Sequence, residues 1–556
     1  MASATHPSGH DDTGVDAPHK YKRLSTQAEN PFSSLVSEQS IAVIPSFTLE
    51  SGVTLRNVPV AYTTRGRLSP ARDNAMIVCH ALTGSADVGD WWGPMLGGPG
   101  RAMDISRFYV VCVNCLGSPY GTASPVTYKD GDPQQGRYGP EFPLTTIRDD
   151  VNLQRLLLDD LGIRQVAVAI GGSMGGMQVL EWAYFGKDYV RAIVPIATSS
   201  QHSAWGISWG EAQRQSIYSD PKYEDGYYSF DDPPTTGLGA ARMSALLTYR
   251  SRDSFESRFG RNTPDPYRQQ NINGSSPLLA TSTPNEHWAI HNEGHRNAKS
   301  PHPASSSGTP VEESSSVLSP PHSANGTTTT FTDPQFSGTR PLTPTTPQSH
   351  IPPSRRASTY FSAQSYLRYQ GNKFVKRFDS NCYIAITRKL DTHDVSRHRT
   401  PHSPAPTPDA LLFSTATPSS PSSTPPTPVS TALSHILQPT LVIGIESDGL
   451  FTFAEQRELA AAIPHARLRT IDSPEGHDAF LLQFEQVNGH ILAFLRDVLP
   501  EIMARRVGPG AGAGLGGDAA GDLRDDDGGE EEVGGVGEVT KSSMFGEVEV
   551  EDITAW

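Results

Sequence analysis

Short apolar runs and amphipathic segments alternate along two separate parts of the chain. In the first part, residues 41–114 contain four strand-like runs: IAVIPSFTLE, VTLRNVPVAYTT, AMIVCHAL and FYVVCVN. The first two alternate between apolar and polar positions, which predicts an antiparallel sheet edge. The last two are continuously apolar, as expected of parallel strands that are buried on both faces.

Helical and strand periods then alternate. TIRDDVNLQRLLLDDLGI has the spacing of an amphipathic helix, and it is followed by the strand QVAVAI, the turn and helix GGSMGGMQVLEWAYF, and the strand RAIVPIAT. The second part begins at the strand PTLVIGI. It continues through the helix FAEQRELAAAI, the strand ARLRTI and a final helix containing AFLLQFEQVNGHILAFL. This order predicts an α/β fold with a doubly wound, mostly parallel sheet.

A large insertion separates the two parts, and its composition is uneven. Residues 205–259 and 361–392 are helix-like and rich in aromatic side chains, whereas residues 262–358 and 397–432 are dominated by Ser, Thr and Pro. Such stretches contain too few apolar side chains to offset the entropy lost on ordering. The predicted organisation is a disordered N-terminus (1–30), a first core part (31–200), a helical lid (201–396) with disordered insertion 262–358, a disordered linker (397–432), a second core part (433–506) and an acidic, Gly-rich tail (507–556).

Charge and cysteine content exclude several classes of protein. The formal net charge is -15 and no basic stripe is evident, so we expect no nucleic-acid partner. The N-terminus lacks an apolar signal region and no run reaches 18 apolar residues, so we expect a cytoplasmic protein that does not bind membranes. Four cysteines are too few for a disulfide framework. Cys112 and Cys115 have C-x-x-C spacing, but buried, reduced thiols are favoured over a zinc or redox site.

The segment Gly171–Gly176 carries the strongest chemical signal. It reads GGSMGG and satisfies G-x-S-x-G between a predicted strand and a predicted helix. In that setting Ser173 would occupy a strained turn at the end of the strand, with the N-terminus of the helix directed at developing negative charge. The alternative is a Gly-rich turn of a nucleotide-binding fold, which the absent G-x-G-x-x-G register and the central Ser disfavour.

A serine nucleophile needs a base, and the base needs an orienting carboxylate. Asp448 follows the strand PTLVIGI, and His477 follows the strand ARLRTI, so their order matches the Ser, acid, His sequence of this fold. Glu446 and Asp472 are rival acids, and His80 is a second histidine at the end of a strand.

The oxyanion hole requires two backbone N–H groups. We expect one from Met174, directly after the nucleophile, and one from Leu82 in the loop that follows AMIVCHAL.

Five separate motifs resemble the homoserine O-acetyltransferase family, and they occur in the family's order. They are HALTGSA, N-x-L-G-S-P-Y-G-T (114–122), FPLTTIRD, IGGSMGGMQ and GHDAF. SWGEAQRQSIYSDPKY, SYLRYQGNKFVKRFD and LDTHDV are similar to the fungal branch. The resemblance covers residues 31–495 apart from the two Ser/Thr/Pro-rich stretches.

The resemblance implies an α/β-hydrolase fold with a helical lid, and a homodimer joined through that lid. It implies acetyl transfer from acetyl-CoA to the hydroxyl of L-homoserine in methionine biosynthesis, by a ping-pong mechanism with no bound cofactor and no metal. The implied roles are nucleophile, acid and base for Ser173, Asp448 and His477, and substrate binding for Arg242, Tyr249 and Asp478.

Other functions stay open at this point. L-Serine O-acetyltransferase and deacetylcephalosporin C acetyltransferase share the scaffold, as does homoserine O-succinyltransferase, although a succinyl donor needs a cation that the loop 80–85 lacks. An esterase or hydrolase would use the same triad with water as the acceptor. A non-catalytic scaffold that presents its Pro-rich segments is disfavoured because all three triad residues are present.

Overall fold

The structure is a computed structural model that describes residues 19–263, 284–295, 360–399 and 427–505. The chain divides into a unit of residues 1–264 and 361–556 and a unit of residues 265–360. In the second unit, the helix α8 (Pro284–His291) is described. Most of the stretches 262–358 and 397–432 and all of the tail 507–556, which we predicted to be disordered or Gly-rich, lie outside the described residues.

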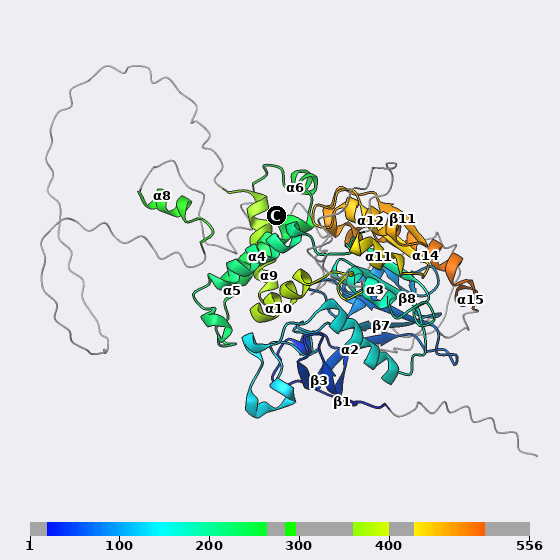
Figure 1. Cartoon of the computed structure of the whole chain (residues 1–556). Coiled ribbons are helices and arrows are strands. Elements are labelled where there is room, and N and C mark those ends of the chain that lie inside the picture. Colours follow the sequence, from blue (N-terminus) through cyan, green and yellow to red (C-terminus); the bar gives the residue numbers. More distant parts are fainter. Residues whose placement is uncertain (1–18, 264–283, 296–359, 400–426, 506–556) are drawn as a thin grey trace, which may run out of the picture. The chain divides into compact units, whose positions relative to one another are not determined.

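A nine-stranded sheet forms the centre of the first unit (Figure 1). Three strands at one edge are antiparallel, and those from β7 to β11 are parallel. This confirms the predicted doubly wound, mostly parallel sheet with an antiparallel edge. In spatial order the strands are β1 (Lys22–Leu24), β2 (Ser40–Thr48), β3 (Thr54–Arg65), β7 (Tyr109–Val113), β4 (Ala75–Cys79), β8 (Val166–Gly172), β9 (Ile193–Ile196), β10 (Thr440–Ile445) and β11 (Ala466–Ile471). A separate pair consists of β5 (Leu96–Gly97) and β6 (Met103–Asp104).

The central strands are buried on both faces, which explains why their sequences are continuously apolar. In β4 all five residues are buried. Ala75, Ile77 and Cys79 belong to one hydrophobic cluster, and Met76 and Val78 belong to another. Because successive side chains of a strand point to opposite faces, the two clusters are the cores on the two sides of the sheet.

Helices supply the other half of each core. The first cluster contains residues of α2 (Ile147–Asp160), α3 (Met174–Ala183), α11 (Pro428–Ser434) and α12 (Phe453–Ala462). The second contains residues of α1 (Val88–Trp92), α13 (Ala479–Leu482), α14 (Phe484–Val498) and α15 (Pro500–Met503). The predicted final helix is therefore two helices, because Gln483 has φ −95° and ψ 55° and interrupts the helical backbone between α13 and α14.

The predicted helical lid forms a layer of its own beside the sheet (Figure 1). Its helices in the first unit are α4 (Ala204–Tyr218), α5 (Thr235–Tyr249), α6 (Arg252–Arg258), α9 (Ser362–Phe374) and α10 (Ser380–Asp391). A third cluster, which includes Phe374, Phe378 and Tyr383 of the lid, also contains Met174 and Met177 of α3. The lid thus packs directly on the helix that follows Ser173.

Three predicted boundaries differ from the structure. Within the stretch 1–30, β1 pairs with β2, and Tyr21 is buried, so residues 19–30 are part of the fold. Within the stretch 262–358, α8 is helical. Within the linker 397–432, Arg397 and Arg399 form ion pairs with glutamates of the core, and α11 begins at Pro428. The predicted disordered stretches therefore include residues that are folded, because these stretches were predicted from composition alone.

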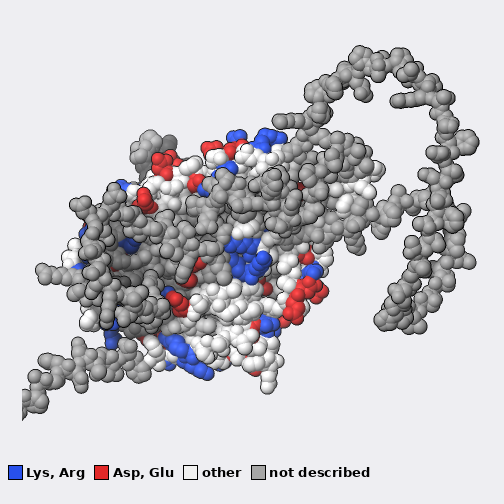
Figure 2. Space-filling model, turned by 180° about the vertical axis from the view of Figure 1, so that it is seen from behind, with Lys and Arg blue, Asp and Glu red and all other residues white. Residues whose placement is uncertain are grey.

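Short 3₁₀ helices occupy several connections: η1 (Ser33–Leu35), η2 (Gly93–Met95), η3 (Lys129–Gly131), η4 (Pro133–Gln135), η5 (Gly139–Glu141), η6 (Glu224–Gly226) and η8 (Gly476–Asp478). On the face shown in Figure 2, basic and acidic side chains of the described residues lie in small groups among uncharged ones. Within the described ranges, none of the helices is long and apolar enough to cross a membrane.

Candidate active site

Ser173 occupies the turn between β8 and α3 in a backbone conformation that side chains rarely adopt. Its φ is 59° and its ψ is −125°, so the residue is strained, and surrounding contacts must hold it. Its N–H donates to the carbonyl of Ile196 at 3.0 Å, and its carbonyl accepts from the Thr198 hydroxyl at 2.8 Å. Met174 is the first residue of α3, so its N–H has no partner within the helix and is available to an oxyanion.

The glycines around Ser173 are required because neighbouring backbone or side-chain atoms lie too close for a β-carbon. A β-carbon at Gly175 would lie 2.1 Å from the carbonyl oxygen of Cys79, at the end of β4. One at Gly176 would lie 2.6 Å from Thr198, and one at Gly171 would lie 2.5 Å from the Gly175 carbonyl oxygen. The GGSMGG pattern is therefore a steric consequence of the tight turn itself and of packing α3 against β4 and the segment that follows β9.

We expect Gly175→Ala to destabilise the fold by about 3 kcal/mol, because the added methyl group collides with backbone that cannot move aside easily. The matched control is Gly489→Ala. Gly489 lies inside α14 with no atom within 4 Å of its would-be β-carbon, so alanine there should stabilise by about 0.5–1 kcal/mol. Chemical denaturation of both variants checks the pair. Equal free energies of unfolding for the two variants would contradict the tight packing of α3.

His477 and Asp448 meet at the carboxyl ends of two adjacent strands. Asp448 follows β10, His477 lies in η8 after β11, and both are buried. His477 Nδ1 lies 2.7 Å from Asp448 Oδ2. The other carboxylate oxygen, Oδ1, accepts the N–H groups of Leu450 at 2.8 Å and Phe451 at 2.9 Å. Asp448 therefore accepts the Nδ1–H of His477, which leaves Nε2 as the nitrogen able to take a proton.

Aromatic rings surround the imidazole of His477. Its ring centroid lies 5.3 Å from that of Phe451, 5.4 Å from Phe480 and 6.2 Å from Tyr249. The first two rings belong to the core and the third belongs to the lid helix α5. These contacts limit rotation of the imidazole, so that Nε2 stays directed towards the pocket.

His80, the other candidate base, has a structural role. Its Nδ1 donates to the carbonyl of Ala81 at 2.8 Å, and its Nε2 accepts from the N–H of Cys115 at 3.1 Å. Complete burial lowers the pKa of His80 to about 4, so the ring is neutral at physiological pH. With both nitrogens engaged, His80 supports the loop 80–85 that carries Leu82 and is not placed to serve as a base.

The four cysteines, Cys79, Cys112, Cys115 and Cys382, are all free and buried. Burial raises the pKa of each thiol, which keeps the thiols protonated and unreactive. Within the described ranges, His, Cys, Asp and Glu side chains do not gather in threes that could hold a metal ion. The C-x-x-C spacing of Cys112 and Cys115 thus belongs to buried thiols, as expected.

The chain is similar over nearly its whole length to known proteins. A family model described as the alpha/beta hydrolase fold matches residues 74–301. The chain is 62% identical over 537 residues to the homoserine O-acetyltransferase of Emericella nidulans, covering 97% of this chain and 98% of the relative. It is 49% identical over 535 residues to the homoserine O-acetyltransferase of Schizosaccharomyces pombe, covering 96% of each. The chain belongs to the homoserine O-acetyltransferase family.

Solved structures show the same fold at low sequence identity. The homoserine O-acetyltransferase from Bacillus anthracis matches with a TM-score of 0.55 at 17% identity, covering 84% of this chain and 98% of that one. Esterase E22 matches with a TM-score of 0.55 at 20% identity, covering 82% of this chain and 99% of that one. Because transferases and esterases share the scaffold, the fold alone does not choose between them.

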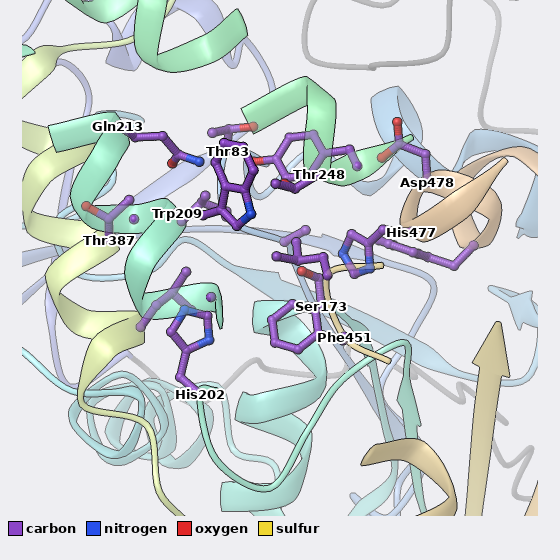
Figure 3. Close-up of a pocket in the computed structure, with 18 of the residues that line it drawn as sticks. Thr83, Ser173, His202, Trp209, Gln213, Thr248, Thr387, Phe451, His477 and Asp478 are labelled. Atoms are coloured by element: carbon purple, nitrogen blue, oxygen red, sulfur yellow. The ribbon is translucent and has the colours of Figure 1, made fainter. Parts of the chain in front are cut away.

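In this member of the homoserine O-acetyltransferase family, one pocket brings most of the predicted site residues together. Figure 3 shows Ser173 and His477 on one side of the pocket, and Trp209, Gln213 and Thr387 of the lid on the other. The pocket is lined by Ala81, Leu82, Thr83, Ser173, His202, Gly206, Trp209, Gly210, Gln213, Thr248, Tyr249, Thr387, Leu390, Leu450, Phe451, His477, Asp478, Phe480 and Leu481. Leu82, Tyr249 and Asp478 therefore line the same pocket as Ser173.

Arg242 lies behind the lining instead of in it. Its side chain is 1% exposed, and its guanidinium carbon lies 5.5 Å from the ring centre of Tyr249 and 4.9 Å from that of Phe374. Arg242 is thus connected to the pocket through Tyr249, whose ring also contacts His477.

Asp478 has a cationic neighbour that the sequence did not reveal. Arg250 places Nε 2.9 Å from Asp478 Oδ2 and Nη1 2.6 Å from Glu475 Oε2. Glu475 also accepts from the Ser254 hydroxyl at 2.6 Å and pairs with Arg258 at 2.9 Å. Burial acts to raise the pKa of Glu475, but the bonds from Arg258 and Ser254 hold it below its ordinary value. The lid and the loop that carries His477 are therefore joined by a charged cluster.

Trp209, Gln213, His202 and Arg250 are pocket or neighbouring residues that sequence reasoning missed. The helical period of α4 is the one feature of the sequence that could have indicated two of them. Trp209 and Gln213 are four residues apart and therefore lie on the same face of that helix. Nothing in the sequence indicates that this face is turned towards Ser173.

Proposed function

We propose that this protein transfers an acetyl group from acetyl-CoA to the hydroxyl of L-homoserine, within methionine biosynthesis. The observation that carries the proposal is Ser173 in a strained turn beside a buried His477–Asp448 pair, in a chain 62% identical to a homoserine O-acetyltransferase. We propose that no metal or tightly bound cofactor takes part, and that acetyl-CoA enters only as a substrate.

The first half-reaction acetylates the enzyme. Ser173 gives its hydroxyl proton to His477 Nε2, and its Oγ attacks the thioester carbonyl of acetyl-CoA. The resulting oxyanion accepts hydrogen bonds from the N–H groups of Leu82 and Met174. As the tetrahedral intermediate collapses, the carbon–sulfur bond breaks and the proton on His477 passes to the leaving CoA thiolate. Acetyl-Ser173 remains.

The second half-reaction repeats these steps with the acceptor. The hydroxyl of homoserine gives its proton to His477 Nε2, and its oxygen attacks the acetyl-Ser173 carbonyl. When the ester of Ser173 breaks, the proton returns to Ser173 Oγ, so the enzyme is regenerated and O-acetylhomoserine leaves. The lid covers this site and limits competition from water during the interval between the two steps.

An amino-acid acceptor needs an anion for its ammonium group and a cation for its carboxylate. Asp478 lines the pocket and supplies the anion. Arg242, stacked behind Tyr249, supplies the cation. Each charge-assisted hydrogen bond of this kind contributes about 1.5–3 kcal/mol. These roles favour a zwitterionic acceptor over water, which is the acceptor in a hydrolase.

The acyl group is proposed to be small and uncharged. Of the residues that line the pocket in the described part of the chain, none is Lys or Arg. A succinyl group would add a second carboxylate beside that of homoserine, for which Arg242 behind the lining is already the proposed partner.

The decisive experiment measures CoA release from acetyl-CoA with homoserine, L-serine, deacetylcephalosporin C and water as acceptors. Homoserine should give a kcat/KM at least tenfold above each of the others. A higher value with L-serine or deacetylcephalosporin C would assign the related transferase, and release that is independent of any amino-acid acceptor would assign a hydrolase.

We expect Arg242→Ala to raise the KM for homoserine by about 10- to 150-fold, the cost of one lost charge-assisted hydrogen bond. Acetylation of the enzyme by acetyl-CoA should change little, because that step involves no carboxylate of homoserine. The steady-state KM for homoserine reports on acceptor binding, and the single-turnover rate of acetylation by acetyl-CoA reports on the first half-reaction. The matched control is Arg214→Ala, which removes an equally buried lid arginine whose partners are Glu211 and Asp391. Equal damage to both half-reactions by Arg242→Ala would assign it a structural role.

We further propose a cytoplasmic homodimer that is joined through the lid and binds neither nucleic acid nor membranes. Free, buried thiols are typical of a reducing compartment. Exposed apolar side chains on the lid include Tyr227, which is 65% exposed, and Leu247, which is 50% exposed. Burial of such side chains would favour self-association. Light scattering of the purified protein tests the stoichiometry.

A further inference from the structure

In the loop 80–85, which carries Leu82, several carbonyl groups accept hydrogen bonds from neighbouring side chains and backbone. The carbonyl of Ala81 accepts from His80 Nδ1 at 2.8 Å and from the Gly84 N–H at 3.1 Å. The carbonyl of Ser85 accepts from Trp91 Nε1 at 3.1 Å. All of these donors belong to the core part of the chain. The loop is thus held at its beginning and its end by the core alone.

The carbonyl of Thr83, in the middle of the loop, is held from the lid. Arg377 lies between α9 and α10, is 5% exposed, and donates from Nη1 to the Thr83 carbonyl at 3.1 Å. The same Nη1 lies 2.9 Å from the hydroxyl of Tyr120, and that hydroxyl donates to the Arg377 carbonyl at 2.9 Å. The guanidinium is therefore fixed by a reciprocal pair of bonds with Tyr120 and is directed at one peptide group of the loop.

Planar peptide units transmit this contact to Leu82. In a trans peptide the C=O of one residue and the N–H of the next point in opposite directions. Fixing the Thr83 carbonyl therefore fixes the Gly84 N–H, which donates to the Ala81 carbonyl. Fixing the Ala81 carbonyl in turn fixes the direction of the Leu82 N–H. Arg377 thus stands two peptide units away from the proposed oxyanion donor.

We propose that Arg377 is a positioning residue that holds the oxyanion loop in the geometry the tetrahedral intermediate requires. The proposal rests on the acyl-serine chemistry proposed for Ser173, but not on the identity of the donor or the acceptor. It makes oxyanion stabilisation depend on the lid, because Arg377 enters from the lid and the loop belongs to the core. An enzyme whose lid is displaced would lose this support and would acylate slowly.

Lys389 offers an internal comparison. It is also a buried lid cation that reaches a core carbonyl, with Nζ 2.7 Å from the Leu116 carbonyl and 2.6 Å from Asp150 Oδ2. It differs from Arg377 in that its carbonyl partner lies outside the loop 80–85 and in that it also pairs with a carboxylate. A purely structural role for Arg377 would make the two cations equivalent, whereas a positioning role would not.

The test uses a small alkylboronic acid, whose boron bonds to Ser173 Oγ and becomes a tetrahedral anion that needs the oxyanion hole. Its dissociation constant is measured by titration for the full-length wild-type protein and for Arg377→Lys. In parallel, the burst of p-nitrophenol from p-nitrophenyl acetate gives the rate constant of Ser173 acetylation. Both readouts are properties of the folded fraction, so partial loss of stability does not change them.

For Arg377→Lys we expect boronate affinity and the acetylation rate constant to fall together by roughly 10- to 100-fold, below the cost of deleting an oxyanion donor outright. Tyr120→Phe removes the bonds that fix the guanidinium but keeps the bond from Arg377 to Thr83, so its loss should be smaller than that of Arg377→Lys. The double variant Lys389→Met with Asp150→Asn should also stay within threefold, although its melting temperature falls.

Boronate affinity within threefold of wild type in Arg377→Lys would overturn the proposal. So would an equal loss of affinity in the Lys389 and Asp150 double variant, or failure of the wild-type protein to bind the boronate. Neither probe contains CoA or homoserine. If the wild type binds boronate but transfers nothing to homoserine, the proposed function fails while the role of Arg377 stands.

Discussion

Replacing Ser173 with alanine is expected to lower the turnover of acetyl transfer by about 10⁴- to 10⁶-fold. Without the hydroxyl, no acetyl-enzyme forms, and His477 has only water or the acceptor to activate. The fold should be unaffected because alanine keeps the β-carbon and therefore the same backbone strain at φ 59°. Steady-state assays at high enzyme concentration, together with thermal denaturation, measure the two quantities.

Rapid quenching with labelled acetyl-CoA locates the intermediate. Label should appear on Ser173 in the wild type and be absent from Ser173→Ala. The cysteines are the alternative nucleophiles, but burial raises the pKa of each thiol, including Cys115, and disfavours the reactive thiolate. Label on a cysteine, or full activity without any labelled residue, would contradict the ping-pong mechanism.

The sequence was sufficient to predict the sheet and the turn that carries Ser173, because both leave local patterns in the sequence. Continuous apolar runs marked β4 and β7 as buried parallel strands, and the structure has them so. The GGSMGG segment marked the turn before α3 because only glycine tolerates the backbone contacts measured at Gly175. In both cases a short stretch of sequence reflects the constraint, even though contacting residues such as Cys79 lie elsewhere in the chain.

Contacts between the lid and the core could not be predicted in this way. Arg250 is 225 residues from Glu475, and Arg377 is 294 residues from Thr83. The sequence around neither arginine indicates which residue it contacts. A single sequence also contains no covariation from which these pairs could be inferred. The short strand β1 was missed for a related reason: two of its three residues, KRL, are charged, and they form a strand only because β2 provides a backbone to pair with.

Asp448→Asn is expected to lower turnover by roughly 10⁴-fold while leaving the fold intact. The reason lies in the two oxygens of Asp448. Oδ1 accepts two backbone N–H groups, from Leu450 and Phe451, and Oδ2 faces His477 Nδ1. In an asparagine, the side-chain carbonyl oxygen must accept from the N–H groups of Leu450 and Phe451, because the side-chain NH₂ in that place would face two other N–H donors. The side-chain NH₂ then faces His477.

That orientation forces the wrong tautomer on the base. With an N–H donor opposite it, His477 Nδ1 becomes an acceptor, the ring proton moves to Nε2, and Nε2 can no longer take the proton of Ser173. The exposed rivals provide matched controls: Glu446→Gln and Asp472→Asn change the same kind of group nearby and should keep activity within about twofold. If Asp448→Asn kept more than a tenth of wild-type turnover while Glu446→Gln or Asp472→Asn lost it, the orienting carboxylate would have to be reassigned. The hydrogen bond between His477 and Asp448 would then be structural.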